Sequence, residues 1–170
     1  MNSADSSRIV VRPARPEEAA AVARTHVEAD RETYEPIFGV KFRAVAMAQS
    51  IARWETAFVA GDVLLVAMDE RRIVGMAHAS ERWMSALYLL ASHHRLGIGR
   101  NLLSRLCEAQ RARSVGEIRF QAVAENHKAL AFYAAMGARE VGRKLEGEGD
   151  DAWMDVIFAL ATDAPALARR

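Results

Sequence analysis

Residues Leu87–Arg100 have the sequence LYLLASHHRLGIGR, which contains the most informative turn of the chain. An apolar run gives way to a short polar turn, and Gly97 and Gly99 then open a segment with helical spacing. N–H groups at the start of a helix attract anions, and glycine lets a phosphate come close to the backbone. Arg95 and Arg100 add positive charge to the same turn. The pattern predicts a strand, a turn and a helix start that together bind a pyrophosphate group.

Other interpretations of the two glycines are a tight corner that binds nothing and two further phosphate motifs. A Walker loop requires Lys-Ser or Lys-Thr after its second glycine, whereas Arg100 and Asn101 follow Gly99. A dinucleotide fingerprint requires a third glycine at the position that Leu102 occupies. Both nucleotide-binding patterns are therefore disfavoured, and the tight corner stays open on this turn alone.

A second cluster lies one predicted strand later, at Asn126–Ala138, with the sequence NHKALAFYAAMGA. Together the two stretches resemble the GNAT superfamily of acyl-CoA N-acyltransferases. The family pattern Gln/Arg-x-x-Gly-x-Gly/Ala is met from His94 to Gly99 except at its first residue. The pattern Asn-x-x-Ala-x-x-Phe-Tyr-x-x-x-Gly is met at every named position of the second cluster. The resemblance extends more loosely from Ile9 to Leu160 and includes Glu32-Thr33-Tyr34.

The resemblance implies an α/β (α+β) fold with a mixed, mostly antiparallel seven-stranded sheet, helices on both faces and a central parallel strand pair that splays. Hydrophobic periodicity indicates the same order of elements. We expect strands at 9–11, 63–68, 73–79, 85–90, 117–123, 138–144 and 153–160, and helices from 16, at 42–59, at 94–115 and at 126–136. The first helix should break at Tyr34-Glu35-Pro36, because proline disfavours helix just before it. Residues 1–7 are expected to be a disordered N-terminus, 8–161 the acetyltransferase domain and 162–170 a flexible C-terminal tail.

The resemblance also implies roles for single residues. Acetyl-CoA is the implied acyl donor, and Tyr133 matches the general acid that protonates the departing thiolate. Asn126 matches a residue that holds the pantetheine arm, and a main-chain N–H near Leu89 or Leu90 could stabilise the oxyanion. The residues implied to bind acetyl-CoA are Leu87, Tyr88, Leu89, His94, Arg95, Leu96, Gly97, Ile98, Gly99, Arg100, Asn126 and Ala129. Considered without the family, Asn126 is a helix cap and Tyr133 a core aromatic residue.

The general base is not identified by the sequence, although an ammonium must lose a proton before it attacks a thioester. Gln121 stands where some protein-acetylating members place a glutamate, and glutamine cannot accept this proton. Glu81, His78 or a chain of water molecules are the candidates left open. Acidic residues between 28 and 35 could attract a cationic amine, but a solvated helix face is the simpler interpretation. Trp83 and Trp153 are interpreted as core or rim residues and as lesser candidates for the wall of an acceptor pocket.

Composition limits the partners of the chain. A length of 170 residues fits one domain, and a net charge of +1 with scattered basic residues argues against a nucleic-acid partner. The single cysteine, Cys107, cannot form an intramolecular disulfide, which favours a reducing compartment. No apolar run reaches the roughly 20 residues of a membrane helix, and the first residues are polar. We expect a cytoplasmic protein with no membrane partner, and the histidines show no spacing for a metal site.

The sequence therefore predicts an N-acetyltransferase that moves an acetyl group from acetyl-CoA to a primary amine of a small molecule or peptide, by direct attack in a ternary complex. The alternative is a catalytically weak acyl-CoA-binding sensor, which Gln121 in place of glutamate motivates. A nucleotide-binding module is the third hypothesis. The resemblance is compatible with a homodimer formed through the last strands.

Overall fold

The structure is a computed structural model that describes residues 9–168. The predicted disorder of residues 1–7 lies outside the described residues. In chain order the elements are β1 (Ile9–Pro13), α1 (Ala19–Phe38), α2 (Met47–Ala60), β2 (Val63–Asp69), β3 (Arg72–Ser80), β4 (Trp83–Leu89), α3 (Ile98–Ala112), β5 (Glu117–Val123), α4 (His127–Ala135), β6 (Arg139–Glu146) and β7 (Trp153–Ala161). This order is the one that the hydrophobic pattern predicts.

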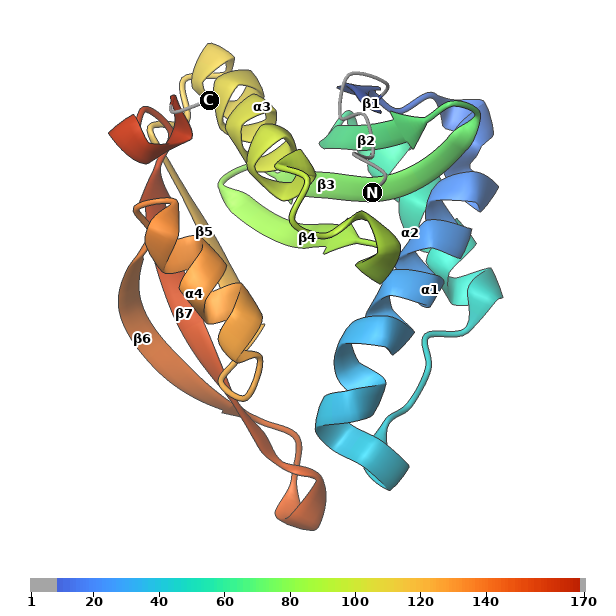
Figure 1. The fold of residues 1–170 in the computed structure, drawn as a ribbon, viewed down its shortest axis with the longest axis vertical. Coiled ribbons are helices and arrows are strands. Elements are labelled where there is room, and N and C mark those ends of the chain that lie inside the picture. The colour runs from blue at the N-terminus through green and yellow to red at the C-terminus, as the bar shows by residue number, and fades with distance from the viewer. Residues whose placement is uncertain (1–8, 169–170) are drawn as a thin grey trace, which may run out of the picture.

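The strands form one seven-stranded sheet in the order β1-β2-β3-β4-β5-β7-β6. Its described strands pair antiparallel everywhere except between β4 and β5. Helices α3 and α4 lie on one side of the sheet, and α1 and α2 lie on the other (Figure 1). The predicted fold class is confirmed.

The parallel pair β4–β5 splays, as predicted. The two strands are in register only at Trp83 and Arg119, where the Arg119 N–H donates to the carbonyl of Arg82 at 2.7 Å. Beyond this point they diverge (Figure 1). The other edge of β4 stays paired with β3 as far as Leu89, although a bulge leaves Ser85 without a register partner. The main chain of β4 on the β5 side is therefore available to another extended group.

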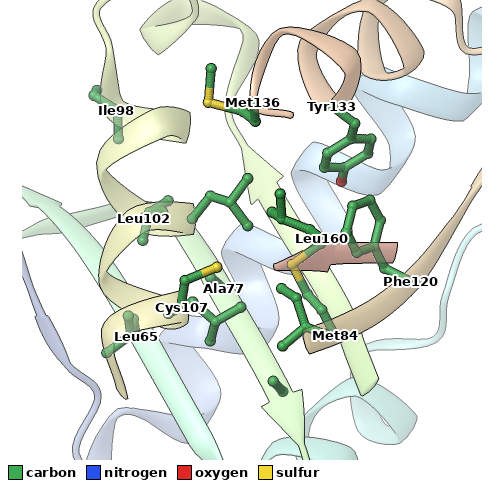
Figure 2. Packing of buried hydrophobic residues seen from close by; sticks show 14 of the residues in the cluster. Leu65, Ala77, Met84, Ile98, Leu102, Cys107, Phe120, Tyr133, Met136 and Leu160 are labelled. Carbon is green, nitrogen blue, oxygen red and sulfur yellow. The ribbon is translucent and has the colours of Figure 1, made fainter. Parts of the chain in front are cut away.

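Two buried clusters hold the helices against the sheet. The larger cluster lies under α3 and α4 and includes Leu102, Cys107, Phe120, Tyr133 and Leu160 (Figure 2). The smaller cluster packs α1 and α2 on the opposite face and centres on Trp54, which is fully buried. The packing role predicted for Cys107 is confirmed.

Three predictions about local structure are wrong. Helix α1 does not break at Tyr34-Glu35-Pro36 but continues to Phe38. Pro36 falls in its last turn, where a missing N–H removes a single helical bond, and the helix ends at Gly39. Helix α3 starts at Ile98 instead of residue 94, because Gly97 has a left-handed φ of 77°. Helix α2 starts five residues late, at Met47, after an extended segment.

A fourth difference concerns the C-terminal segment, where residues 162–168 are packed and not loose. The Thr162 hydroxyl is buried and donates to the carbonyl of Val115 at 3.0 Å. The hydroxyl of Ser104 on α3 donates to the carbonyl of Leu167 at 2.9 Å. The segment can dock in this way because side chains of α3 satisfy its carbonyl groups.

Candidate functional site

The glycine turn before α3 presents main-chain N–H groups without helical partners. The first helical bond runs from the N–H of Asn101 to the carbonyl of Gly97 at 3.0 Å. The N–H groups of Ile98, Gly99 and Arg100 precede it and have no carbonyl within the helix to receive them. A side-chain carbon added at Gly97 would meet nothing within 4 Å. The turn therefore has the donors and the space that an anion requires.

The side chains around this turn make different contacts. Leu96 packs against the larger buried cluster, and Ile98 lies within it, so both can serve a ligand only through their main chain. Arg95 is exposed and has a φ of 66°. The guanidinium of Arg100 donates to the carbonyl of Ala166 at 2.7 Å. Arg100 therefore binds the C-terminal segment with its side chain.

The residues predicted to line β4 divide between the two faces of the sheet. Leu87 and Leu89 pack toward the larger cluster, whereas Tyr88 also touches the smaller one, and its hydroxyl donates to Asp30 at 3.2 Å. The Leu90 N–H donates to the carbonyl of Val74 on β3 at 2.9 Å. Leu90 is thereby excluded as the predicted oxyanion donor.

Main-chain groups of β4 alternate in direction, so those of Leu89 point the opposite way from the N–H of Leu90, toward β5. The imidazole Nε2 of His94 lies 2.9 Å from the carbonyl oxygen of Leu89, and since a carbonyl only accepts, His94 is the donor. The Leu89 N–H stays as the candidate that faces the splayed strands. His94 fixes the end of β4 and is not a phosphate ligand through this contact.

Asn126 combines the two roles that the sequence left open. Its Oδ1 accepts the N–H of Ala129 at 3.2 Å and so caps α4. Its side chain also lies near the Tyr34 hydroxyl, whose pKa it acts to lower. Asn126 therefore caps α4 and faces α1 at the end of β5.

Tyr133 projects from α4 toward β5, with its ring 4.5 Å from that of Phe120 (Figure 2). The rings of Phe132 and Phe158 also lie against it, at 5.4 and 5.8 Å. Within residues 9–168 the Tyr133 hydroxyl has no hydrogen-bond partner, and burial raises its pKa well above the usual range. The phenol thus stays protonated and can donate a hydrogen bond to a ligand in the space between β4 and β5.

Tyr34, in the last turns of α1, bridges the two splayed strands from the opposite face. Its hydroxyl lies near Tyr88 of β4 and Asn126, which both act to lower its pKa. Burial, followed by the charges of Asp30 and Asp155, outweighs them and raises the pKa to about 12. The continuation of α1 through Pro36 is what places this residue over the sheet.

Asp155 on β7 is the site candidate that sequence reasoning missed. The residue is only 4% exposed, and its Oδ2 accepts the Gln121 amide at 2.6 Å. Within residues 9–168 its Oδ1 has no hydrogen-bond partner. Burial raises the pKa of this carboxyl group, and the nearby charge of Glu146 raises it further. The site therefore still contains a carboxylate although residue 121 is glutamine, and the Gln121 amide orients that carboxylate. The only signal in the sequence is an aspartate inside an apolar strand.

The other predicted base candidates have structural partners. Glu81 lies exposed in the turn between β3 and β4 with a φ of 50°, and its carbonyl accepts the Gln110 side chain. His78 is buried between Asp62, 3.0 Å from Nε2, and the bulged Ser85, 2.7 Å from Nδ1. Burial lowers the His78 pKa, against the opposing effect of Asp62. The contacts of His78 with Asp62 and Ser85 hold the bulge in β4.

Of the acidic residues of α1, Glu28, Glu32 and Glu35 are exposed as the solvated-face interpretation expects, whereas Asp30 is not. Asp30 is buried beneath Tyr88, and burial raises its pKa. The Glu32 carboxylate accepts the N–H of Ala91 at 2.7 Å and so ties α1 to the loop before the glycine turn. Glu28 is exposed and pairs with Arg72 at 2.9 Å.

Among residues 9–168, no group of three or more His, Cys, Asp or Glu side chains could hold a metal ion. Within the same range, no helix is long and apolar enough to cross a membrane.

Residues 25–138 match the model of the acetyltransferase (GNAT) family. The chain belongs to this family. It is an acyl-CoA-dependent acyltransferase of the GNAT type, as the motifs at Leu87–Arg100 and Asn126–Ala138 predict. No curated protein sequence matches it significantly.

Solved structures share the fold at low identity. The putative acetyltransferase yncA of Salmonella typhimurium, solved with acetyl-CoA, is 20% identical with a TM-score of 0.73, over 92% of this chain and 95% of that one. A ribosomal-protein-alanine N-acetyltransferase of Brucella melitensis is 23% identical with a TM-score of 0.72, over 89% and 99%. A phosphinothricin acetyltransferase of Sinorhizobium meliloti, in complex with acetyl-CoA, is 23% identical with a TM-score of 0.68, over 91% and 88%.

Proposed function

We propose that this GNAT protein transfers an acetyl group from acetyl-CoA to a primary amine of a small molecule or peptide, by direct attack in a ternary complex. The observation that carries the proposal is the divergence of β4 and β5 beyond the Trp83–Arg119 pair. At one end of this divergence lie the N–H groups of the glycine turn, and the Tyr133 phenol packs over β5 against Phe120. That arrangement suits a long thioester that carries a pyrophosphate.

Binding would use the main chain more than charged side chains. The N–H groups from Ile98 to Arg100 would hold the pyrophosphate, with exposed Arg95 adding charge. The β5-facing edge of β4 at Leu87 and Leu89 would pair with the amide-containing arm, as an added strand does. Acetyl-CoA supplies the activated acyl group in this scheme.

The proton transfers of the proposed reaction balance. The neutral amine attacks the acyl carbon, an N–C bond forms and the C–S bond breaks. Tyr133 donates its hydroxyl hydrogen bond, and then its proton, to the departing thiolate, and the proton lost by the amine balances the one supplied. The Leu89 N–H is the main-chain donor proposed for the oxyanion.

The test is an amine panel with purified protein and acetyl-CoA, in which free thiol is measured together with the mass of the amine product. We expect thiol release with at least one amine class and a product heavier by one acetyl group. Tight acetyl-CoA binding without thiol release for any amine would instead support the alternative function, a catalytically weak acyl-CoA-binding sensor.

A further inference from the structure

A group of aromatic side chains surrounds the buried carboxylate of Asp155. Phe38 at the end of α1 lies 6.0 Å from the ring of Tyr34 and 5.8 Å from that of Trp153. Trp153 and Asp155 are two residues apart on β7 and so share one face of the strand. Trp153 acts to lower the pKa of Asp155, and the charge of Asp155 acts to raise the pKa of Tyr34. These three rings and Asp155 are called the aromatic carboxylate site below.

The carboxylate of this site is incompletely satisfied. Gln121 on β5 serves Oδ2, whereas Oδ1 is buried and has no partner among the described residues. A carboxylate in this state is unfavourable unless a ligand supplies a donor or a positive charge. Asp155 lies on the face of the sheet that α1 covers. Tyr133 and the glycine turn lie on the opposite face.

The surrounding charges favour a cation. Lys144 on β6 lies directly opposite Asp155 in the sheet, and its positive charge acts to lower the Asp155 pKa, but its ammonium group pairs with Glu146 at 2.7 Å. Glu125, after β5, adds a further negative charge. Aromatic faces attract cations, and this attraction strengthens when the site excludes water.

We propose that the aromatic carboxylate site binds the ammonium group of the acceptor and that Asp155 accepts its proton before the amine attacks. The inference deepens the proposed function, on which its second half rests. It specifies the acceptor as an alkylamine that is cationic in solution. The N–H bond of the ammonium breaks, its proton moves to a carboxylate oxygen of Asp155, and the lone pair is freed for the acyl carbon.

Binding can be tested without catalysis by the fluorescence of Trp153 during titration with ethylammonium chloride, against sodium chloride at equal ionic strength. We expect a saturable change that disappears in Trp153→Phe, because Trp54 and Trp83 lie elsewhere. Asp155→Asn, which keeps the side-chain shape, should weaken this binding at least about tenfold. Asp163→Asn, the same change on an exposed turn, should leave it unaltered. Equal affinity in Asp155→Asn would overturn the proposed site.

The proton transfer is tested by comparing ethylamine with trifluoroethylamine, which is largely uncharged at neutral pH. Asp155→Asn should lower kcat/KM for ethylamine by about 10²–10⁴ and for the fluorinated amine by much less. Asp155→Glu should recover part of the ethylamine rate. An equal loss for both amines would contradict the role as base. Ammonium binding with no thiol release for any amine would refute the proposed function but keep the site.

Discussion

The ring of Tyr133 lies 4.5 Å from the ring of Phe120, so hydrocarbon contacts alone hold the phenol in place. Removing the hydroxyl in Tyr133→Phe should therefore preserve the packing and remove only the proton donor. We expect kcat to fall by about 10²–10⁴ while acetyl-CoA affinity stays nearly unchanged. Steady-state kinetics and a binding titration measure the two effects. Turnover that matches the wild type across the pH range would refute the general-acid assignment.

Gly97→Asp tests the glycine turn. The new carboxylate would occupy the open space before the N–H groups of α3 and repel a pyrophosphate, so acetyl-CoA affinity should fall at least about tenfold. The matched control is Gly61→Asp, because Gly61 is also left-handed, at φ 71°, with nothing within 4 Å. Both variants carry the same backbone strain, and only the first should lose affinity by calorimetry. Equal affinity in the two variants would exclude the turn as the phosphate site.

Gly75→Ala tests the close approach of β3 to β4. A carbon added at Gly75 would lie 2.8 Å from Leu89 Cδ1 and 3.0 Å from the Tyr88 carbonyl oxygen. We expect the free energy of unfolding to fall by about 1–3 kcal/mol in denaturant titrations. Gly116→Ala meets nothing within 4 Å and should change stability by less than about 0.5 kcal/mol. A wild-type stability for Gly75→Ala would show that β4 can shift freely.

His26 should make the fold sensitive to acid. It is buried against Trp54 with Nδ1 2.8 Å from the Ser50 hydroxyl, and burial, followed by the charge of Arg53, lowers its pKa from 6.5 to about 4. Between these values the unfolded chain binds the proton that the folded chain excludes, so stability is full above pH 6.5 and falls toward pH 4. The expected loss is roughly 2–3 kcal/mol. Denaturant midpoints for His26→Gln should show a flatter acid limb, and an unchanged limb would contradict this assignment.

The sequence was sufficient for the parts of the site that depend on local patterns. The glycine turn, the cap at Asn126 and the bounds of β5 each follow from residues that are adjacent in the chain. The structure agrees with them because these features depend on neighbouring residues. The glycine of the turn adopts the conformation that the turn requires, and the apolar run itself forms the buried strand.

Asp155 could not be found in this way. Its burial results from pairing between β5 and β7 and from the last turns of α1, which lie far apart in the sequence. The expected helix break at Tyr34-Glu35-Pro36 also missed the continuation of α1 to Phe38, because a proline in a last turn is hard to distinguish from one that ends a helix. The packing of residues 162–168 depends on Arg100 and Ser104 of α3, which no local pattern links to them.

The central claim is that the divergence of β4 and β5 beside the glycine turn binds acetyl-CoA. Its most direct test is the melting temperature of the purified protein during titration with acetyl-CoA, with ATP and NAD as competing ligand classes. The account predicts a melting temperature that rises with acetyl-CoA concentration and is unchanged by the two nucleotides, since only a ligand that binds the folded chain stabilises it. No rise at saturating acetyl-CoA, or an equal rise with ATP, would contradict it.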